Sequence, residues 1–524
     1  MGCLGSDVMS GFARGWDEEI RVDARDYRQH DGLGLAGLVA AGEVTAIELL
    51  TAARDRAAAV NPLINAICIR FDEYADQRAA EQLSGPFAGV PFLLKDLYQS
   101  LAGLPISDGC RALVGRKAAH TSTIVQRWLD AGVVVFGRTS TPELGSKGVT
   151  ESALFGPTRN PWNLSRTPGG SSGGAAAAVA AGIVPVAGAS DGGGSIRIPA
   201  ACTGLVGLKP GRGLVPFGPQ DSEPLNGLAT HGVVSRTVRD TAAMLDVLVG
   251  PDPMSPYAAA LPDRPLLDQL DDAPGPLRIG YTTRCALREP HPEAVHAVEH
   301  AAQLLTELGH HVEEVDPPHD DRQLGRDFLV IWFVHQALEV DRIQRDTGAG
   351  DEGFEPDTRL MAALGRTFRA VELQAADERR REHIAALAAF HTSHDLLLTP
   401  TLGEPPIRIG SLDLPARLRA LTEALLRARA TRLLRLGDIL DQVVERNLAW
   451  VPYTQLANIT GRPAISLPLH QTADGLPMGV QFVGRLASED LLLRLARQLE
   501  RAIPWTQHLP VDLPPTDRSP TAMT

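Results

Sequence analysis

The segment PGGSSGGAAAAVAAGIVPVAGASDGGGSIRIPAACTGLVGLKP, residues 168–210, decides the fold class. The small residues of 171–181 predict a helix that ends at Gly182, because glycine readily adopts the backbone geometry of a helix end. Residues 183–187 predict a strand, and the glycine and serine residues of 190–195 predict a loop. The segment therefore predicts a helix followed by a strand inside an α/β protein.

Helices and strands continue to alternate on both sides of this segment. The predicted elements are strand 90–94, helix 123–131, strand 133–136, strand 277–281, helix 292–308, strand 311–315, strand 464–468, strand 479–483 and helix 488–502. Residues 320–450 are mostly helical and rich in Arg and Leu. Such alternation is typical of an α/β sheet with helices on its faces.

Composition excludes several classes of protein. The formal net charge is −13, so the chain has no excess of cations to neutralise the phosphates of nucleic acid. The five cysteines are scattered and form no C-x-x-C pair, which favours a reducing cytoplasm over a disulfide framework or a cysteine zinc site. The longest uncharged stretch, 167–190, is rich in Gly and Ser, whereas a membrane helix needs about 20 strongly apolar residues. We therefore expect a cytoplasmic protein that binds neither nucleic acid nor membrane.

Lysine is unusually rare in this chain. Only four of the 50 basic residues are lysine, namely Lys95, Lys117, Lys147 and Lys209. Base composition of the genome accounts for such a bias, but the four positions remain informative, because burial can neutralise lysine and not arginine. Lys95 ends the apolar run 90–94, where loss of hydration lowers the pKa of an amine. It is a candidate for a neutral base.

Two loops rich in glycine and serine accompany Lys95, namely 169–174 and 191–199. Glycine lets backbone N–H groups and hydroxyls approach one another closely. Ordinary turns around a buried lysine are the alternative. A phosphate-binding loop is disfavoured, because neither segment ends in G-K-[ST].

Other motifs compete with this interpretation. The strings 169–173 and 188–192 match G-x-S-x-G, but a nucleophile elbow needs a strand before the serine and a helix after it. Polar residues precede Ser171 and glycines follow Ser190, which disfavours a Ser-His-Asp enzyme. The string His296-x-x-Glu299-His300 matches a zinc pattern, but it lies opposite the apolar stripe of its helix. We expect a solvated face there and no metal.

Residues 168–210 resemble the signature segment of the amidase signature family, and GVPFLLKD, residues 89–96, resembles the lysine segment of that family. Asn160-Pro161-Trp162-Asn163 and GRPAISLP, residues 461–468, are also similar to family elements, and the likeness runs from about residue 33 to 510. The resemblance implies the family's α/β fold, one large domain with a mixed sheet covered by helices on both sides.

The expected domain organisation follows from this likeness and from composition. The segments are an N-terminal arm (1–32), the catalytic domain (33–512), a variable helical region over the cleft (320–450) and a C-terminal tail (513–524).

The resemblance implies an amidase that hydrolyses a carboxylic amide to a carboxylate plus ammonia or an amine. Ser195 corresponds to the acylated nucleophile, Lys95 to the base, and Ser171 to the serine that bridges them. The family usually holds the bridging serine by a cis peptide, which is the Gly170–Ser171 bond here. No metal or organic cofactor is implied.

The loop around Ser195 contains further candidates. The predicted oxyanion donors are the backbone N–H groups of Gly192, Gly193, Gly194 and Ser195. Asp191 and Arg197 are expected to pair and fix the loop, and Gly145 is expected near the substrate amide. Ser172 is expected to stabilise the start of the following helix.

The substrate is the least determined property. Segments 84–97, 158–174 and 474–500 are similar to bacterial hydrolases of the 6-aminohexanoate-cyclic-dimer type, which implies an ω-amino-acid amide as a small-molecule substrate. A glutaminase subunit of a tRNA-dependent amidotransferase is the alternative, with helix 416–446 as a partner surface. A homodimer is compatible with either. Five aromatic residues either line the acyl pocket or pack in the core: Phe328, Trp332, Phe333, Trp450 and Tyr453.

Overall fold

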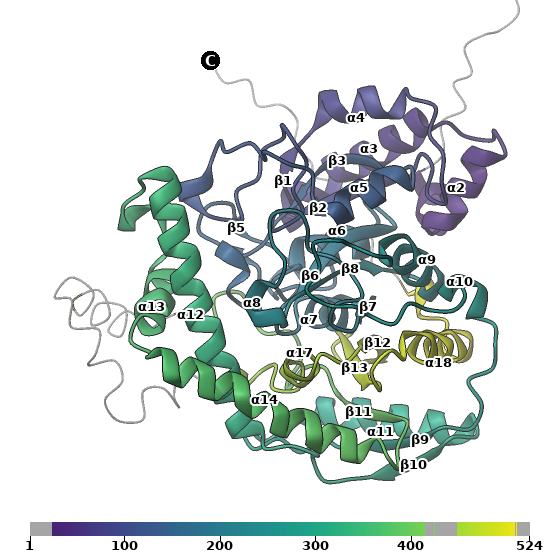
Figure 1. Ribbon diagram of the computed structural model, residues 1–524. Coiled ribbons are helices and arrows are strands. Elements are labelled where there is room, and N and C mark those ends of the chain that lie inside the picture. Colours follow the sequence, from purple (N-terminus) through teal and green to yellow (C-terminus); the bar gives the residue numbers. More distant parts are fainter. Residues whose placement is uncertain (1–23, 414–423, 425–447, 509, 511–524) are drawn as a thin grey trace, which may run out of the picture.

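A computed structural model describes residues 24–413, 424, 448–508 and 510 (Figure 1). Its centre is an eight-stranded sheet in the order β10-β9-β11-β13-β12-β7-β8-β6. These strands are β6 (Val186–Asp191), β7 (Val206–Lys209), β8 (Thr230–Ser235), β9 (Arg278–Tyr281), β10 (His311–Glu314), β11 (Leu396–Pro400), β12 (Ala464–Gln471) and β13 (Pro477–Val483). Strands β10, β9 and β11 run parallel, and the remaining neighbours pair antiparallel. The predicted mixed sheet of an α/β protein is confirmed.

A second, three-stranded sheet lies beside β6, in the order β1 (Ile67–Arg70), β3 (Val134–Thr139), β2 (Pro91–Lys95). The side chain of Gln99 joins the two sheets: its Oε1 accepts from the N–H of Lys95 at 2.6 Å, and its Nε2 donates to the carbonyl of Ala189 at 3.1 Å. Gly188 makes room for Gln99, because a Cβ there would lie 2.4 Å from its Oε1. A short hairpin, β4 (Glu151–Ser152) and β5 (Gly156–Pro157), stands apart.

Helices cover the sheets. The helices are α1 (Ala24–Gln29), α2 (Gly32–Ala40), α3 (Ala46–Ile64), α4 (Asp72–Ala79), α5 (Thr123–Asp130), α6 (Gly173–Ala180), α7 (Arg197–Thr203), α8 (Pro224–Gly227), α9 (Val238–Leu248), α10 (Leu266–Gln269), α11 (Pro292–Glu307), α12 (Asp321–Thr347), α13 (Pro356–Gly365), α14 (Ala370–Phe390), α17 (Gln455–Thr460) and α18 (Glu489–Ala502). Helix α6 is buried along its whole length. Its residues are mostly Gly and Ala, and their small size lets the helix pack closely against β2, β3 and β6. Among the described residues, no helix is long and apolar enough to cross a membrane.

The elements of the signature segment begin later than predicted. The predicted helix 171–181 begins at Gly173, and the predicted strand 183–187 lies at Val186–Asp191. Pro185 has no N–H for a sheet ladder, so regular pairing begins after it. Ser190 therefore belongs to β6 and not to the loop.

Residues 24–32, expected in an N-terminal arm, are instead docked on the domain. They form α1 and the beginning of α2. The buried hydroxyl of Tyr27 donates to the carbonyl of Ile183 at 2.9 Å, and Arg236 donates to the carbonyls of Arg28 and His30. The mixed composition of this segment predicted a loose arm, because composition does not indicate that one tyrosine is buried and anchors the segment.

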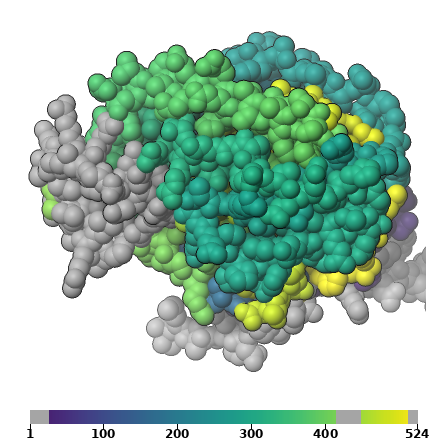
Figure 2. Space-filling view, turned by 90° about the horizontal axis from the view of Figure 1, so that it is seen from below, coloured from purple at the N-terminus to yellow at the C-terminus, as the bar shows by residue number. Residues whose placement is uncertain are grey.

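The described part of residues 320–450 is mostly helical, as predicted. Helices α12, α13 and α14 form an outer layer beside α17, and the green band along the upper part of the face in Figure 2 belongs to this layer. The buried run Leu396–Pro400, however, forms β11 within the main sheet. A short apolar run that ends at proline suits a buried strand better than a helix, and this strand is an exception within the mostly helical region. The predicted helix 416–446 lies outside the described residues apart from position 424.

Candidate active site

Lys95 lies at the end of β2, where the two sheets meet, and is completely buried. Its Nζ is 2.8 Å from Oγ of Ser171 and 3.0 Å from Oγ of Ser190. Burial lowers the pKa of Lys95 to about 7, although the nearby carboxylate of Asp191 acts in the opposite direction. The amine is therefore substantially neutral near physiological pH and touches a serine hydroxyl.

Ser171 follows a cis Gly170–Ser171 peptide bond, as the resemblance implied. Gly170 passes close to the backbone of Val149, since a Cβ at this position would lie 2.6 Å from the Val149 carbonyl carbon. Gly145, which was expected near the substrate amide, lies close to Ser171: a Cβ there would be 3.4 Å from Oγ of Ser171. The backbone of Gly145 is left-handed, with φ +65°, which favours glycine.

Ser172 does not cap the next helix. Its hydroxyl donates to the carbonyl of Ser190 at 3.2 Å and accepts from the N–H of Ser190 at 3.3 Å, and it makes no capping bond to α6. The backbone N–H of Ser172 donates to the carbonyl of Ser195 at 3.3 Å. Ser172 thus ties the Ser171 segment to both β6 and the Ser195 loop.

The Ser195 loop begins where β6 ends, and Asp191 organises it. The carboxylate of Asp191 accepts from Arg197 at 3.0 Å and from the N–H of Gly194 at 2.7 Å. Burial alone would raise the pKa of Asp191, but the charge and hydrogen bonds of Arg197, with the Asn458 amide, hold it well below its usual range. The ion pair with Arg197 is completely buried.

This arrangement corrects one expected oxyanion donor. Because the N–H of Gly194 donates to Asp191, it is not directed at a substrate. Gly194 is required for a different reason: its φ is +125°, and a Cβ there would lie 2.4 Å from Oγ1 of Thr454. Gly192, Gly193 and Ser195 remain as the candidate donors.

Residues far away in the sequence complete the support of the loop. Arg197 donates to the carbonyl of Thr454 at 2.7 Å and to Oδ1 of Asn458 at 2.6 Å. Nδ2 of Asn458 donates to Oδ1 of Asp191 at 2.9 Å. Nothing in the local sequence distinguishes these residues, although Asn458 precedes the family-like segment 461–468 by only a few positions.

The expected aromatic residues divide into two groups. Phe328 and Trp332 of α12 stack with centroids 5.2 Å apart and lie against the loop, since a Cβ at Gly193 or Gly192 would meet them at 2.6 and 3.3 Å. All five residues are buried, and the second group is Phe333, Trp450 and Tyr453, of which the Tyr453 hydroxyl donates to the carbonyl of Thr283.

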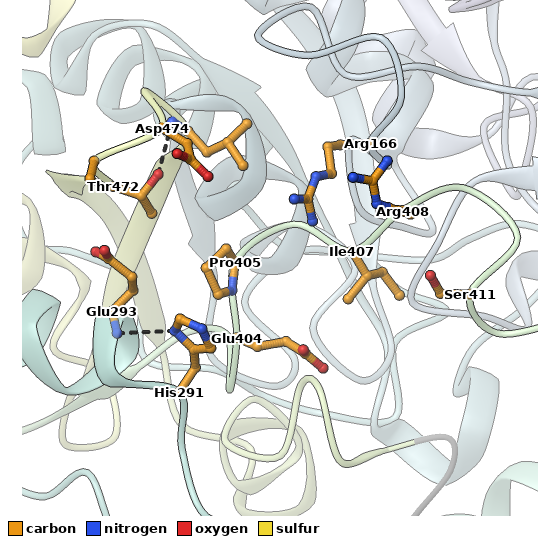
Figure 3. A pocket seen from close by; sticks show the side chains of 12 residues that line it. Arg166, His291, Glu293, Glu404, Pro405, Ile407, Arg408, Ser411, Thr472 and Asp474 are labelled. Carbon is orange, nitrogen blue, oxygen red and sulfur yellow. Dashed lines mark hydrogen bonds between the residues drawn. The ribbon is translucent and has the colours of Figure 1, made fainter.

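Two other features lie away from this site. His296, Glu299 and His300 are exposed, as predicted, and the described residues contain no cluster suited to a metal ion. A surface pocket of about 440 Å³ lies between the start of α11, the turn after β12 and residues 404–411 (Figure 3). Its twelve lining residues include none of the predicted site residues.

The buried amine of Lys95 contacts Ser171, and the Ser171 segment is bonded to the loop of Ser195. Such an arrangement is typical of serine hydrolases in which lysine replaces histidine as the base. Comparison with known proteins agrees. The profile of the Amidase family matches residues 48–493. The 6-aminohexanoate-cyclic-dimer hydrolase of Pseudomonas sp. (strain NK87) is 39% identical, and the match covers 94% of this chain and 98% of that protein. The chain therefore belongs to the amidase signature family, and it is a hydrolase of carbon–nitrogen bonds in non-peptide amides.

Solved structures show the same relationship. A 6-aminohexanoate cyclic dimer hydrolase complexed with substrate has a TM-score of 0.83 and 36% identity, with 93% of this chain and 99% of that chain covered. A glutamyl-tRNA(Gln) amidotransferase subunit from Thermotoga maritima has a TM-score of 0.72 and 26% identity, with 93% and 98% covered. The fold is thus that of amidases with different partners and substrates.

Proposed function

We propose that the chain hydrolyses amides through an acyl-enzyme on Ser195, with Ser171 as the proton relay and Lys95 as the base. One observation carries this assignment: the buried Nζ of Lys95 lies 2.8 Å from Oγ of Ser171. With a pKa lowered to about 7 by burial, the amine is available to accept a proton at pH 7–8.

The proposed reaction has the following steps. Lys95 accepts the hydroxyl proton of Ser171, Ser171 accepts that of Ser195, and Ser195 attacks the amide carbonyl carbon. The relay then returns a proton to the leaving nitrogen, so that the carbon–nitrogen bond breaks and an ester of Ser195 remains. Water activated by the same relay hydrolyses this ester and releases the carboxylate.

The backbone N–H groups of Gly192, Gly193 and Ser195 are the proposed donors to the oxyanion. Each well-placed donor of this kind contributes about 3 kcal/mol to the transition state. Asp191 and Arg197 hold the loop in shape through their buried ion pair and through the bonds from the N–H groups of Gly194 and Ile196 to Asp191. Glycine at 192 and 193 is needed because Phe328 and Trp332 pack directly against the loop.

The proposed substrate is an amide of an ω-amino acid of the 6-aminohexanoate type. Two observations support it: the similarity to 6-aminohexanoate-cyclic-dimer hydrolases, and the apolar side chains of Phe328 and Trp332 that pack against the Ser195 loop and suit a methylene chain. A glutaminase subunit is less well supported, because the amidotransferase subunit is less similar in sequence and in structure. The helix suggested as its partner surface lies outside the described residues.

A substrate panel on the purified, chelator-treated chain tests this function. The panel contains 6-aminohexanoate cyclic dimer, a linear 6-aminohexanoate oligomer, short aliphatic and aromatic amides, and glutamine. We expect carboxylate release without ATP or a partner, and the highest kcat/KM for a 6-aminohexanoate amide. A preference for glutamine would favour the glutaminase, and activity only with added metal or a second subunit would refute the proposal.

A further inference from the structure

His231 is a buried histidine beside Lys95 that the proposed reaction does not use. It lies in β8, directly opposite Ser190 of β6 in the antiparallel register. Residues that oppose each other directly in this way project from the same face of a sheet. Oγ of Ser190 contacts Nζ of Lys95 on that face. The imidazole of His231 therefore faces the side of the sheet where Lys95 lies.

Aromatic rings surround this imidazole. The ring centroid of Phe217 is 4.1 Å away and that of Tyr98 is 6.4 Å away, and His231 is only 1% exposed. Neither Nδ1 nor Nε2 of His231 has a hydrogen-bond partner among the described residues. An unpaired polar group costs free energy in such a place, where phenylalanine would pack without that cost. A buried ring whose two nitrogens make no hydrogen bond within the described residues points to a use of that ring during the reaction.

The ring remains uncharged under working conditions. Burial, and then the charge of Lys95, lower the pKa of His231 to about 3. The neighbouring ionisable groups are otherwise engaged: Asp191 pairs with Arg197, and the hydroxyl of Tyr98 lies 3.5 Å from Nε2 of His335. Asp96, next to Lys95, accepts from the hydroxyl of Ser107 and lies 3.9 Å from Arg138. Lys95 is thus the group near His231 whose charge changes as the proton moves.

We propose that His231 is a positioning residue that acts through Lys95: its neutral ring stabilises the ammonium that forms when Lys95 accepts the proton of Ser171. The inference rests on the proposed relay, in which the O–H bond of Ser171 breaks as an N–H bond forms on Lys95. An uncharged dipole suits this purpose, because it favours the ammonium without holding it permanently. A carboxylate in the same place would keep Lys95 charged and unable to act as a base.

The test compares His231→Phe with His231→Gln. Phenylalanine fits among Phe217 and Tyr98, so the melting temperature should be maintained or raised. Without the dipole Lys95 becomes a weaker base, so the acidic limb of the kcat/KM profile should move about 0.5–1 pH unit lower, and the plateau should fall about 3- to 10-fold. Glutamine keeps a polar group, and its profile should match that of the wild type more closely.

His391→Phe is a matched control. His391, at the end of α14, is also buried, with Nε2 unpaired among the described residues, and burial lowers its pKa to about 4. It lies in a different part of the fold, so we expect the wild-type profile. If His231→Phe does not fold, His231→Leu carries the same prediction.

Superimposable profiles of wild type and His231→Phe would overturn the inference, and so would equal shifts in His231→Phe and His391→Phe. Lys95→Arg in the same assay separates the two proposals. If Lys95→Arg keeps most activity, the relay itself is wrong. If it is inactive while the His231 variants behave as wild type, only the role of His231 is wrong.

Discussion

Lys95 and Lys209 lie at the ends of two strands, β2 and β7, and are a natural pair for comparison. Both are buried, and burial lowers the pKa of each to about 7. Their contacts differ. Lys95 touches the hydroxyls of Ser171 and Ser190, whereas Nζ of Lys209 donates to the carbonyl of Pro210 at 2.6 Å.

The difference shows that a lowered pKa is not sufficient for a base. A carbonyl oxygen has no proton to give, so a neutral Lys209 cannot begin a relay. A hydroxyl within hydrogen-bond distance can lose its proton to the amine. The assignment of Lys95 as the base therefore depends on the serine hydroxyls that lie next to its amine. The following predictions test this assignment, from the largest expected effect to the smallest.

Ser195→Ala should have the largest effect, because it removes the atom that is acylated. Loss of a nucleophile costs on the order of 10⁶-fold in kcat. Steady-state kinetics measure this loss, and mass spectrometry after reaction with a fluorophosphonate should locate the label on Ser195 of the wild type. A label on Ser171 or Ser190 would show that another serine is the nucleophile. It would contradict the proposed relay from Ser195 through Ser171 to Lys95.

Ser171→Ala should leave more residual activity, because Ser171 moves protons and does not form the covalent bond. A positioned acid or base contributes about 10²–10⁴-fold, so kcat should fall by about that factor. Single-turnover kinetics measure the acylation rate directly. A variant that acylates as fast as wild type would show that Lys95 does not act through Ser171.

Asp191→Asn should act on stability more than on chemistry. Removal of one partner of a buried ion pair costs about 3–5 kcal/mol, because Arg197 remains charged and buried. Chemical unfolding measures this loss. Glu314→Gln breaks a half-exposed pair with Arg284 and is the control, with an expected loss of about 0–1 kcal/mol. Equal losses in the two variants would contradict the supporting role of Asp191.

Lys209→Met should have the smallest effect on activity, with kcat/KM within about threefold of wild type, because it touches no reacting group. Its effect is on pH-dependent stability. Between a folded pKa of about 7 and the ordinary value of 10.5, the unfolded chain binds more protons at this lysine than the folded chain, so stability rises with pH. Unfolding at pH 7.5 and 9.5 should show a smaller rise in Lys209→Met. An inactive Lys209→Met variant would contradict the conclusion that only Lys95 of these two lysines takes part in the reaction.

The central site could be predicted from sequence because its parts are continuous motifs. Lys95 ends an apolar run, and Ser171 and Ser195 lie in loops whose glycines are unusual enough to identify the family. The cis bond and the Asp191–Arg197 pair follow from the same segment.

The support of the site could not be predicted in the same way. Gln99 follows β2, Asn458 lies in α17 and His231 lies in β8, and only the packing of these separate elements brings them to β6, the Ser195 loop and the side of the sheet where Lys95 lies. No local pattern encodes that packing. Gly194 was expected to donate to the oxyanion together with its neighbours, but its N–H donates to an oxygen of Asp191 instead. The packing of separate elements decided the positions of Gln99, Asn458 and His231, and a hydrogen bond within the loop decided that of the Gly194 N–H.

The most direct measurement is kcat/KM for Lys95→Arg and Lys209→Arg across pH 6–10. Arginine keeps the positive charge but does not give up its proton in this range. We expect Lys95→Arg to be inactive at every pH and Lys209→Arg to remain active, while the wild-type rate falls below about pH 7 as Lys95 gains a proton. A near-wild-type rate for Lys95→Arg would contradict the assignment of Lys95 as the base.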